Sequence, residues 1–388
     1  MKTTAGRKRC VIAILLAFLA SMASAGYARS PVVLHAPPQH TALAARLQWA
    51  HSAAGQHADG VWIGYSIQRL MHENSHIGNY GSRTRHLPTL DQVLRGETVP
   101  APSAGVTREQ QMLNAARRAL RSSGDDKESR EKVLKDVAII FRLPPRAKDL
   151  TQLEKVRISN LDLYVDLKGL PLLWLGAVKD AKSIPFLDGL YGKVQQRKPR
   201  KDLMVAVSLH DTKDLVVPAL QRYATKEKDQ DLRGEAAFWL GQQDHPDALK
   251  TLRKVVKDDA SLKVRKKAVF ALSQMSLEGA VDGLIDVARS DASRELQKEA
   301  IFWLGQKASA KARKSLKDVV FDNEETEIQE QAVFAISQWP KDQSIPALGD
   351  IAKNHPHPKI REKAIFWLGE TRDPRAVEAL VEILKGST

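Results

Sequence analysis

Residues 300–306 read AIFWLGQ, and close copies of this stretch recur along the second half of the chain. Two copies keep the Trp, namely AAFWLGQ at 236–242 and AIFWLGE at 364–370. Between successive Trp-containing copies lie AVFALSQ at 268–274 and AVFAISQ at 332–338, in which Ala replaces Trp. Neighbouring copies are 32 residues apart, and copies that share Trp are 64 apart. A fixed period of this length is typical of stacked structural repeats.

Each repeat has the apolar spacing of two helices. In the first half of one repeat, apolar residues recur at i, i+4, i+7 and i+8, which is the spacing of a helix with one buried face. These residues are Val264, Ala268, Ala271 and Leu272. After a turn, the same spacing returns at Ala280, Leu284, Val287 and Ala288. Neighbouring helix pairs are expected to stack, because one pair cannot bury its apolar faces alone.

The repeats resemble the HEAT family, in the short form of the phycobilisome-lyase-type repeats. The matching residues are Leu232-Arg233, Val264-Arg265 and Ile360-Arg361 in the first helix, with Leu240-Gly241, Leu304-Gly305 and Leu368-Gly369 at its end. The resemblance extends from Leu170 to the end and includes degenerate units at 172–190 and 205–224. It implies a mainly α fold, a right-handed α-solenoid of about seven helix pairs with a 32-residue period, preceded by a small α+β module.

The alternation of Trp and Ala is interpreted as a packing device. The residues in this position are Trp174, Trp239, Trp303 and Trp367 in alternate repeats, with Ala271 and Ala335 between them. A large side chain beside a small one lets adjacent layers interdigitate at the density of a protein interior. The functional alternative is a row of Trp side chains that stack on a ligand.

Residues 1–25 have the pattern of a secretory signal peptide. A basic start is followed by the apolar run VIAILLAFLA at 11–20 and by ASA at 23–25, a typical cleavage site. The apolar run is shorter than the roughly 20 residues that span a bilayer, so removal is favoured over a membrane anchor. The chain is therefore expected to be exported, to the periplasm or out of the cell, and not to span a membrane after removal.

The composition limits the available chemistry. Cys10 is the only cysteine and lies within the signal segment, so thiol nucleophiles and thiolate metal sites are excluded from the mature chain. The formal net charge is +14, and four of the basic residues belong to the signal segment. The remaining excess of Lys and Arg predicts some attraction to anionic components of the cell envelope.

The part between the signal segment and the repeats is less regular. We expect a flexible lead at 26–60 with one short helix near 41–51, a small α+β module at 61–168 and the solenoid at 169–388. The predicted strands, rich in β-branched and aromatic residues, are 60–68, 137–143, 155–159 and 161–167. The predicted helices of the module are 108–122 and 128–136. The stretch WIGY followed later by GLPLLWLG resembles the sequence of exported bacterial HEAT proteins that carry such a module.

The stretch HENSH at 72–76 fits H-E-x-x-H, a motif in which two His on one helical face bind zinc and the Glu activates water. The candidate ligands are His72 and His76, with Glu73 as the base. The surroundings favour a polar turn, because a predicted strand precedes the motif and IGNYGS follows it. We therefore predict no catalytic residue and no cofactor. The alternative is a zinc-dependent hydrolase that uses the solenoid as its substrate arm.

The repeats test whether the basic charge marks a nucleic-acid surface. Lys254 is followed at the same position of later repeats by Asp286, Asp318, Asp350 and Glu382. A groove that follows phosphates needs charge of one sign, so we predict no binding of nucleic acid. The extended surface of a solenoid instead favours a non-catalytic protein–protein interaction scaffold or adaptor in the envelope or exterior. Its macromolecular partner is expected on the solenoid surface.

The last repeat keeps the internal pattern although solenoids normally end in a unit with a polar outer face. The apolar candidates for partner binding in its second helix are Val377, Leu380, Val381 and Leu384. We expect this end to contact either the partner or a second copy of the chain. In the alternative, the last helix tilts inward and Glu378, Glu382 and Lys385 screen the remaining apolar surface.

Overall fold

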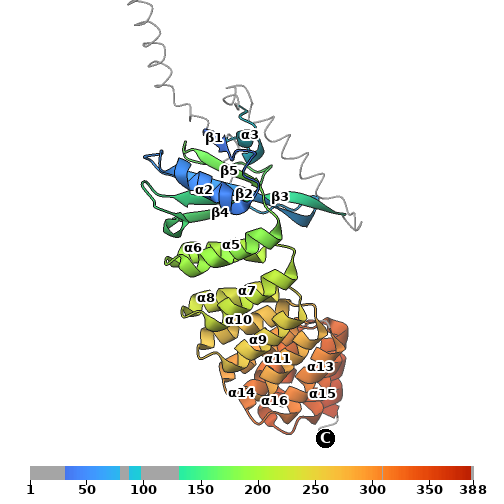
Figure 1. Cartoon of the computed structure of the whole chain (residues 1–388). Helices are drawn as coiled ribbons and strands as arrows, with labels where there is room; N and C mark the ends of the chain where they lie inside the picture. The colour runs from blue at the N-terminus through green and yellow to red at the C-terminus, as the bar shows by residue number, and fades with distance from the viewer. Residues whose placement is uncertain (1–30, 79–86, 98–130, 308, 386–388) are drawn as a thin grey trace, which may run out of the picture. The chain divides into compact units, whose positions relative to one another are not determined.

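The computed structural model describes residues 31–78, 87–97, 131–307 and 309–385 (Figure 1). Contacts divide the chain into two compact units, residues 1–206 and 207–388. The signal segment and the helix predicted at 108–122 lie outside the described residues. Within the described residues, no helix is both long enough and apolar enough to cross a membrane.

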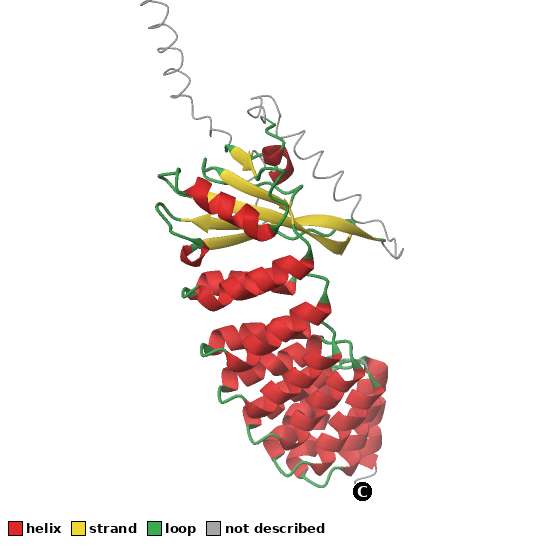
Figure 2. Ribbon diagram, in the orientation of Figure 1, coloured by secondary structure: helices red, strands yellow, loops and turns green. Residues whose placement is uncertain are grey.

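The first unit is built on a five-stranded sheet (Figure 2). In spatial order the strands are β1 (Val33–His35), β5 (Leu172–Ala177), β2 (Val61–His72), β3 (Lys132–Leu143) and β4 (Lys155–Asn160). Strands β2 and β3 pair antiparallel over their full length, and β5 runs parallel to both of its neighbours. The described part of this unit also holds α2 (Leu43–Ala54), α3 (Leu90–Leu94), the 3₁₀ turn η2 (Leu150–Gln152) and α5 (Asp180–Lys193).

Both faces of the central part of this sheet are buried. On one face, the rings of Tyr65 and Phe141 contact Phe186 of α5 with centroids 6.2 and 6.0 Å away. The Tyr65 hydroxyl bonds the Ser183 hydroxyl at 2.8 Å, and burial raises the pKa of that phenol well above its ordinary range. On the other face, Trp62 donates its indole N–H to the carbonyl oxygen of Leu167 at 3.1 Å. This second layer explains why residues from α3 and 161–170 join the core.

Several predictions for this unit are confirmed and others are wrong. The strands at 60–68, 137–143 and 155–159 and the helix near 41–51 are present as β2, β3, β4 and α2. Residues 132–136 lie in β3 and not in the predicted helix at 128–136, because they pair with the outer end of β2. Residues 161–167 form no strand and keep only an isolated bridge between Thr89 and Tyr164. Residues 33–35, predicted in the flexible lead, form β1.

The predicted first helical unit at 172–190 begins with a strand. Residues 172–177 form β5, which lies between β1 and β2, and only the following α5 is helical. Trp174 is consequently part of the sheet core and does not belong to the Trp series of the repeats. A parallel strand that is buried on both faces reads as a continuous apolar run, which sequence periodicity does not separate from a buried helix. The repeat array is therefore shorter than the predicted seven pairs.

The second unit is an array of helices that confirms the 32-residue period. The helices from the end of the first unit onward are α6 (Arg197–Ser208), α7 (Lys213–Lys226), α8 (Gln230–Gly241), α9 (Pro246–Asp258), α10 (Leu262–Gln274), α11 (Glu278–Ser290), α12 (Arg294–Gly305), α13 (Ala310–Asp322), α14 (Thr326–Ser337), α15 (Lys341–Asn354), α16 (Pro358–Glu370) and α17 (Pro374–Lys385). Five complete pairs run from α8/α9 to α16/α17. The even-numbered member is the first helix of each pair and the odd-numbered member is the second.

The Trp and Ala positions distinguish two kinds of contact between first helices. A Cβ atom at Gly241 of α8 would lie 2.8 Å from the Cβ of Ala271 in α10, so these backbones meet closely. Gly305 of α12 approaches Ala335 of α14 in the same way, with a corresponding distance of 3.0 Å. At the intervening contacts, aromatic rings fill the space.

These aromatic contacts join α10 to α12 and α14 to α16. Phe270 meets Trp303 with ring centroids 5.0 Å apart, and Phe334 meets Trp367 at 5.2 Å. Ala271 and Ala335 are buried, whereas Trp303 and Trp367 are half-buried. Phe238 also stacks on Phe270 between α8 and α10, with ring centroids 6.0 Å apart. The 64-residue period therefore reflects the alternation of Trp with Ala in the first helices and not of aromatic contact as such.

We predict that Gly241→Ala lowers the free energy of unfolding by about 1–3 kcal/mol, because the new methyl group overlaps Ala271. The matched control is Gly369→Ala in the equivalent position of α16, where an added Cβ meets nothing within 4 Å. This control should be neutral or gain up to about 1 kcal/mol, since Ala is the better helix former. Urea denaturation of both variants measures the difference, and equal effects would contradict the close approach.

Candidate interaction surfaces

The structure places the HENSH motif at the end of a strand. His72 is the last residue of β2, and the backbone N–H and hydroxyl of Ser75 donate to its carbonyl oxygen at 2.9 and 2.7 Å. His76 contacts the carboxylate of Asp162 at 3.0 Å. His72 and His76 therefore do not share a helical face, which the zincin motif requires. Among the described residues, no group of three or more His, Cys, Asp or Glu is arranged to hold a metal ion.

From this geometry we expect no stoichiometric zinc in the purified protein and no effect of His72→Ala/His76→Ala on any peptidase activity. The reason is that the turn after β2 does not align the two imidazoles with Glu73 as base. Metal analysis of the wild type and the double variant provides the measurement. One zinc per chain that disappears in the double variant, together with an activity that disappears with it, would prove the expectation wrong.

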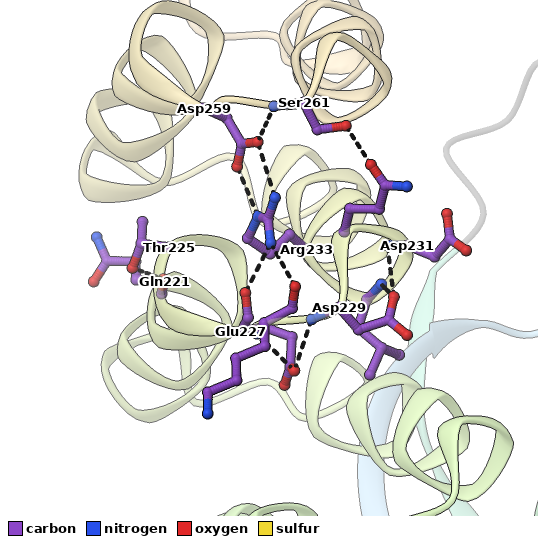
Figure 3. A network of polar contacts seen from close by, with 11 residues as sticks. Gln221, Thr225, Glu227, Asp229, Asp231, Arg233, Asp259 and Ser261 are labelled. Atoms are coloured by element: carbon purple, nitrogen blue, oxygen red, sulfur yellow. Dashed lines mark hydrogen bonds and ion pairs between the residues drawn. The ribbon is translucent and has the colours of Figure 1, made fainter.

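A partly buried ion pair joins the loops between repeats (Figure 3). Arg233 of α8 donates from Nε and Nη2 to the carboxylate of Asp259, at 2.8 and 3.1 Å. Its Nη1 donates to the carbonyl oxygens of Glu227 and Lys228 at 2.9 and 3.0 Å. The hydrogen bonds to Asp259 raise the pKa of the Arg233 guanidinium. This arginine therefore joins the loop before its own helix to the loop that follows α9.

The next repeats modify this connection in a coordinated way. Arg265 and Asp291 form the same ion pair one repeat later. In the third repeat both members are neutral, because Gln297 and Asn323 occupy the two positions. In the fourth, Gln329 donates to the carbonyl oxygen of Asn323 at 2.7 Å. Sequence reasoning missed the network, although a residue-by-residue comparison of the repeats shows the joint loss of both charges.

We predict that Arg233→Gln alone costs about 2–3 kcal/mol of stability, because the Asp259 carboxylate loses its charged partner and keeps only the hydrogen bond from the backbone N–H of Ser261. The double variant Arg233→Gln/Asp259→Asn reproduces the natural pair of the third repeat and should recover most of the loss. As the control, Arg294→Gln breaks an exposed pair with Glu325 and should cost less than about 1 kcal/mol. Thermal unfolding of the three variants tests the order, and a double variant no better than the single one would contradict it.

The C-terminal helix carries exposed apolar side chains. Val377, Val381 and Leu384 of α17 are 60%, 42% and 71% exposed. Leu380 lies beside them and is half-buried. On α16, Phe366 is 54% exposed, compared with 39% for Phe302 at the equivalent position of α12. Three of the four predicted contact residues therefore face solvent in the described chain.

Two further hollows were missed by the sequence analysis. One, of about 520 Å³, lies between α2, η2 and α5, with Phe186 and Leu190 among its apolar residues and Asp149 at its rim. The hydrogen bond from Thr151 lowers the pKa of Asp149. The other, of about 540 Å³, lies between α9 and α11. Neither shows in the sequence, because each is lined by residues of helices that are brought together only by packing.

A family model described as HEAT repeats matches residues 217–305, 281–353 and 314–388. HEAT repeats are found in the C-terminal region. They fit the helix pairs from α8 to α17, in which Gly241 and Gly305 end a first helix as the resemblance implied. No curated protein matches the chain in sequence.

Solved structures give distant likenesses. YibA of E. coli is 16% identical, with a TM-score of 0.32, over 53% of this chain and 76% of its own. Human deoxyhypusine hydroxylase is 15% identical, with a TM-score of 0.23, over 51% and 81%. The complex of CpcE and CpcF of phycocyanin lyase from Nostoc is 20% identical, with a TM-score of 0.28, over 39% and 96%. A shared fold alone does not assign a function to this chain.

Proposed function

We propose that this chain is a non-catalytic interaction scaffold that binds a protein partner on the surface of its HEAT repeats. The observation that carries the proposal is the stack of helix pairs from α8 to α17, which extends a surface one unit at a time. At roughly 10 Å per layer, five pairs offer some 50 Å of surface without the need for a deep cavity. Such a surface suits an extended partner better than a small substrate.

The proposed place of action is the cell envelope or the exterior. The support is the pattern of residues 1–25, with its basic start, apolar run and small residues. The excess of basic residues supports an additional attraction to anionic envelope components. The same pattern supports a chain that does not span the membrane once the segment is removed.

The exposed end of α17 is the contact site that we propose for the partner. Covering Val377, Val381 and Leu384 removes apolar surface from water, at about 25 cal/mol per Å². A second copy of the chain is the competing occupant of this face. The flanking Glu378, Glu382 and Lys385 are exposed and form a charged border around the apolar side chains.

We expect Val381→Glu/Leu384→Lys to reduce capture of the partner in a crosslinking pull-down from the envelope by about tenfold, since charges at a packed contact are strongly unfavourable. Leu134→Glu on β3, an exposed apolar position outside the repeats, serves as the control and should leave capture unchanged. Light scattering of the same proteins reports self-association. A monomeric wild type whose partner capture is unaffected by the double substitution would overturn the assignment of this face.

A further inference from the structure

The second helices present a face whose charge changes sign once along the array. The same position of successive second helices holds Arg222, Lys254, Asp286, Asp318, Asp350 and Glu382. The position is thus basic in α7 and α9 and acidic in α11, α13, α15 and α17. We call the exposed cations of α7 and α9 the basic end, which consists of Arg222, Lys226, Lys250, Lys254 and Lys257.

Ion pairs within the described residues do not neutralise the lysines of α9. Asp286, the nearest acidic residue of this position, receives a hydrogen bond from Arg253 at 2.6 Å. Asp318 is paired in the same way with Arg289 of α11. Lys250, Lys254 and Lys257, in contrast, form no ion pair with any residue that the structure describes. Their spacing places them on one side of α9, one turn apart.

A hollow with an apolar floor adjoins these lysines. It measures about 540 Å³, within the range of roughly 300–1,000 Å³ that is usual for ligand pockets. Its floor contains the buried side chains of Val256, Leu272 and Val287. Lys254 and Lys257 stand at its rim.

The size of the hollow depends on Gly283 in its wall, and the charge at its rim depends on which acidic residues are already paired. Gly283 forms part of the wall, and a Cβ there would come within 3.2 Å of Arg253 and Leu272, so a larger residue would narrow the space. Asp291 at the rim is already paired with Arg265. Asp286 also lines the hollow and is paired with Arg253. Beyond these pairs, Lys254 and Lys257 face the single carboxylate of Asp258, which leaves one uncompensated positive charge at the rim.

We propose that the basic end and this hollow together bind an acidic segment of a partner protein that carries a large apolar side chain. The carboxylates of the segment pair with Lys250, Lys254 and Lys257, and the apolar side chain enters the hollow between α9 and α11. This inference deepens the proposed interaction role and rests on it. It adds a second contact face to the one proposed on α17 and names the chemistry of the partner segment that binds there.

The change of sign beyond α9 sets the length of the acidic segment and excludes a long polyanion. Two units span about 20 Å, which an extended chain covers with about six residues at roughly 3.3 Å each. Past that point Asp318 and Asp350 would repel further negative charge. A nucleic acid carries negative charge along its whole length and would extend over these acidic residues. A peptide with a short acidic run therefore fits this face better.

The test uses the full-length mature protein and a fluorescent peptide of about twelve residues with six consecutive Asp or Glu followed by one Leu. Fluorescence anisotropy should show binding that weakens as salt rises, because the contacts are exposed. Changing the Leu of the peptide to Ala should weaken binding several-fold, as should replacing the acidic residues with Lys. An oligothymidylate of about the same charge serves as the competing anion.

The decisive variants exchange lysines on two different second helices. Lys254→Glu/Lys257→Glu should weaken peptide binding by roughly tenfold, since two attractive contacts become repulsive. Lys314→Glu/Lys317→Glu on α13 is the matched control, with the same charge change at two exposed lysines three residues apart. The control should bind the peptide like the wild type.

Several outcomes would overturn the inference. These are absence of peptide binding at low salt, an equal loss in the α13 control, or oligothymidylate that binds as tightly while the Leu-to-Ala peptide loses nothing. The pull-down separates this inference from the proposed function. If the Lys254→Glu/Lys257→Glu protein still captures its envelope partner in full, the docking face is wrong and the scaffold role stands.

Discussion

Stacking of one helix pair on the next is the constraint on which the repeat unit depends. A single pair leaves its apolar face in water, so every internal layer has to be covered on both sides. The Leu that recurs every 32 residues shows this directly. Leu220, Leu252, Leu284, Leu316 and Leu348 are fully buried, whereas Leu380 of the last helix is only half-buried. The exposed side chains of α17 are therefore the direct consequence of a layer with no neighbour in the described chain.

Two devices hold neighbouring layers in register. Glycine against alanine, as at Gly241 and Ala271, lets first helices approach closely, and aromatic rings fill the contacts between these closer pairs. The pair of Arg233 and Asp259 fastens the loops at the helix ends. The two devices follow different periods, because the packing alternates every 64 residues while the loop network loses its charges only in the third and fourth repeats. Loop charge is thus not required for the stack itself.

The sequence predicts the repeat unit well because the same apolar pattern occurs five times, and five copies together distinguish helix from strand where a single copy would not. The first unit offers no such repetition. The apolar run LLWLG is equally compatible with a buried helix and a buried parallel strand, and only its pairing with β1 and β2 decides for β5. Residues 132–136 look helical in isolation but extend β3. The exposed end of α17 was predictable from apolar spacing, whereas the hollow between α9 and α11 depends on how two helices meet.

Features that break the repeat period are the best guide to function in such an array. Whatever stacking requires has to recur in every unit, as the buried Leu and the Phe of the first helices do. The change from Lys254 to Asp286 at one position of the second helices occurs once and does not follow the 64-residue packing period. Stacking therefore gives no reason for a basic end at α7 and α9. A partner that is acidic where it contacts α7 and α9 would give one, because complementary charge favours its binding.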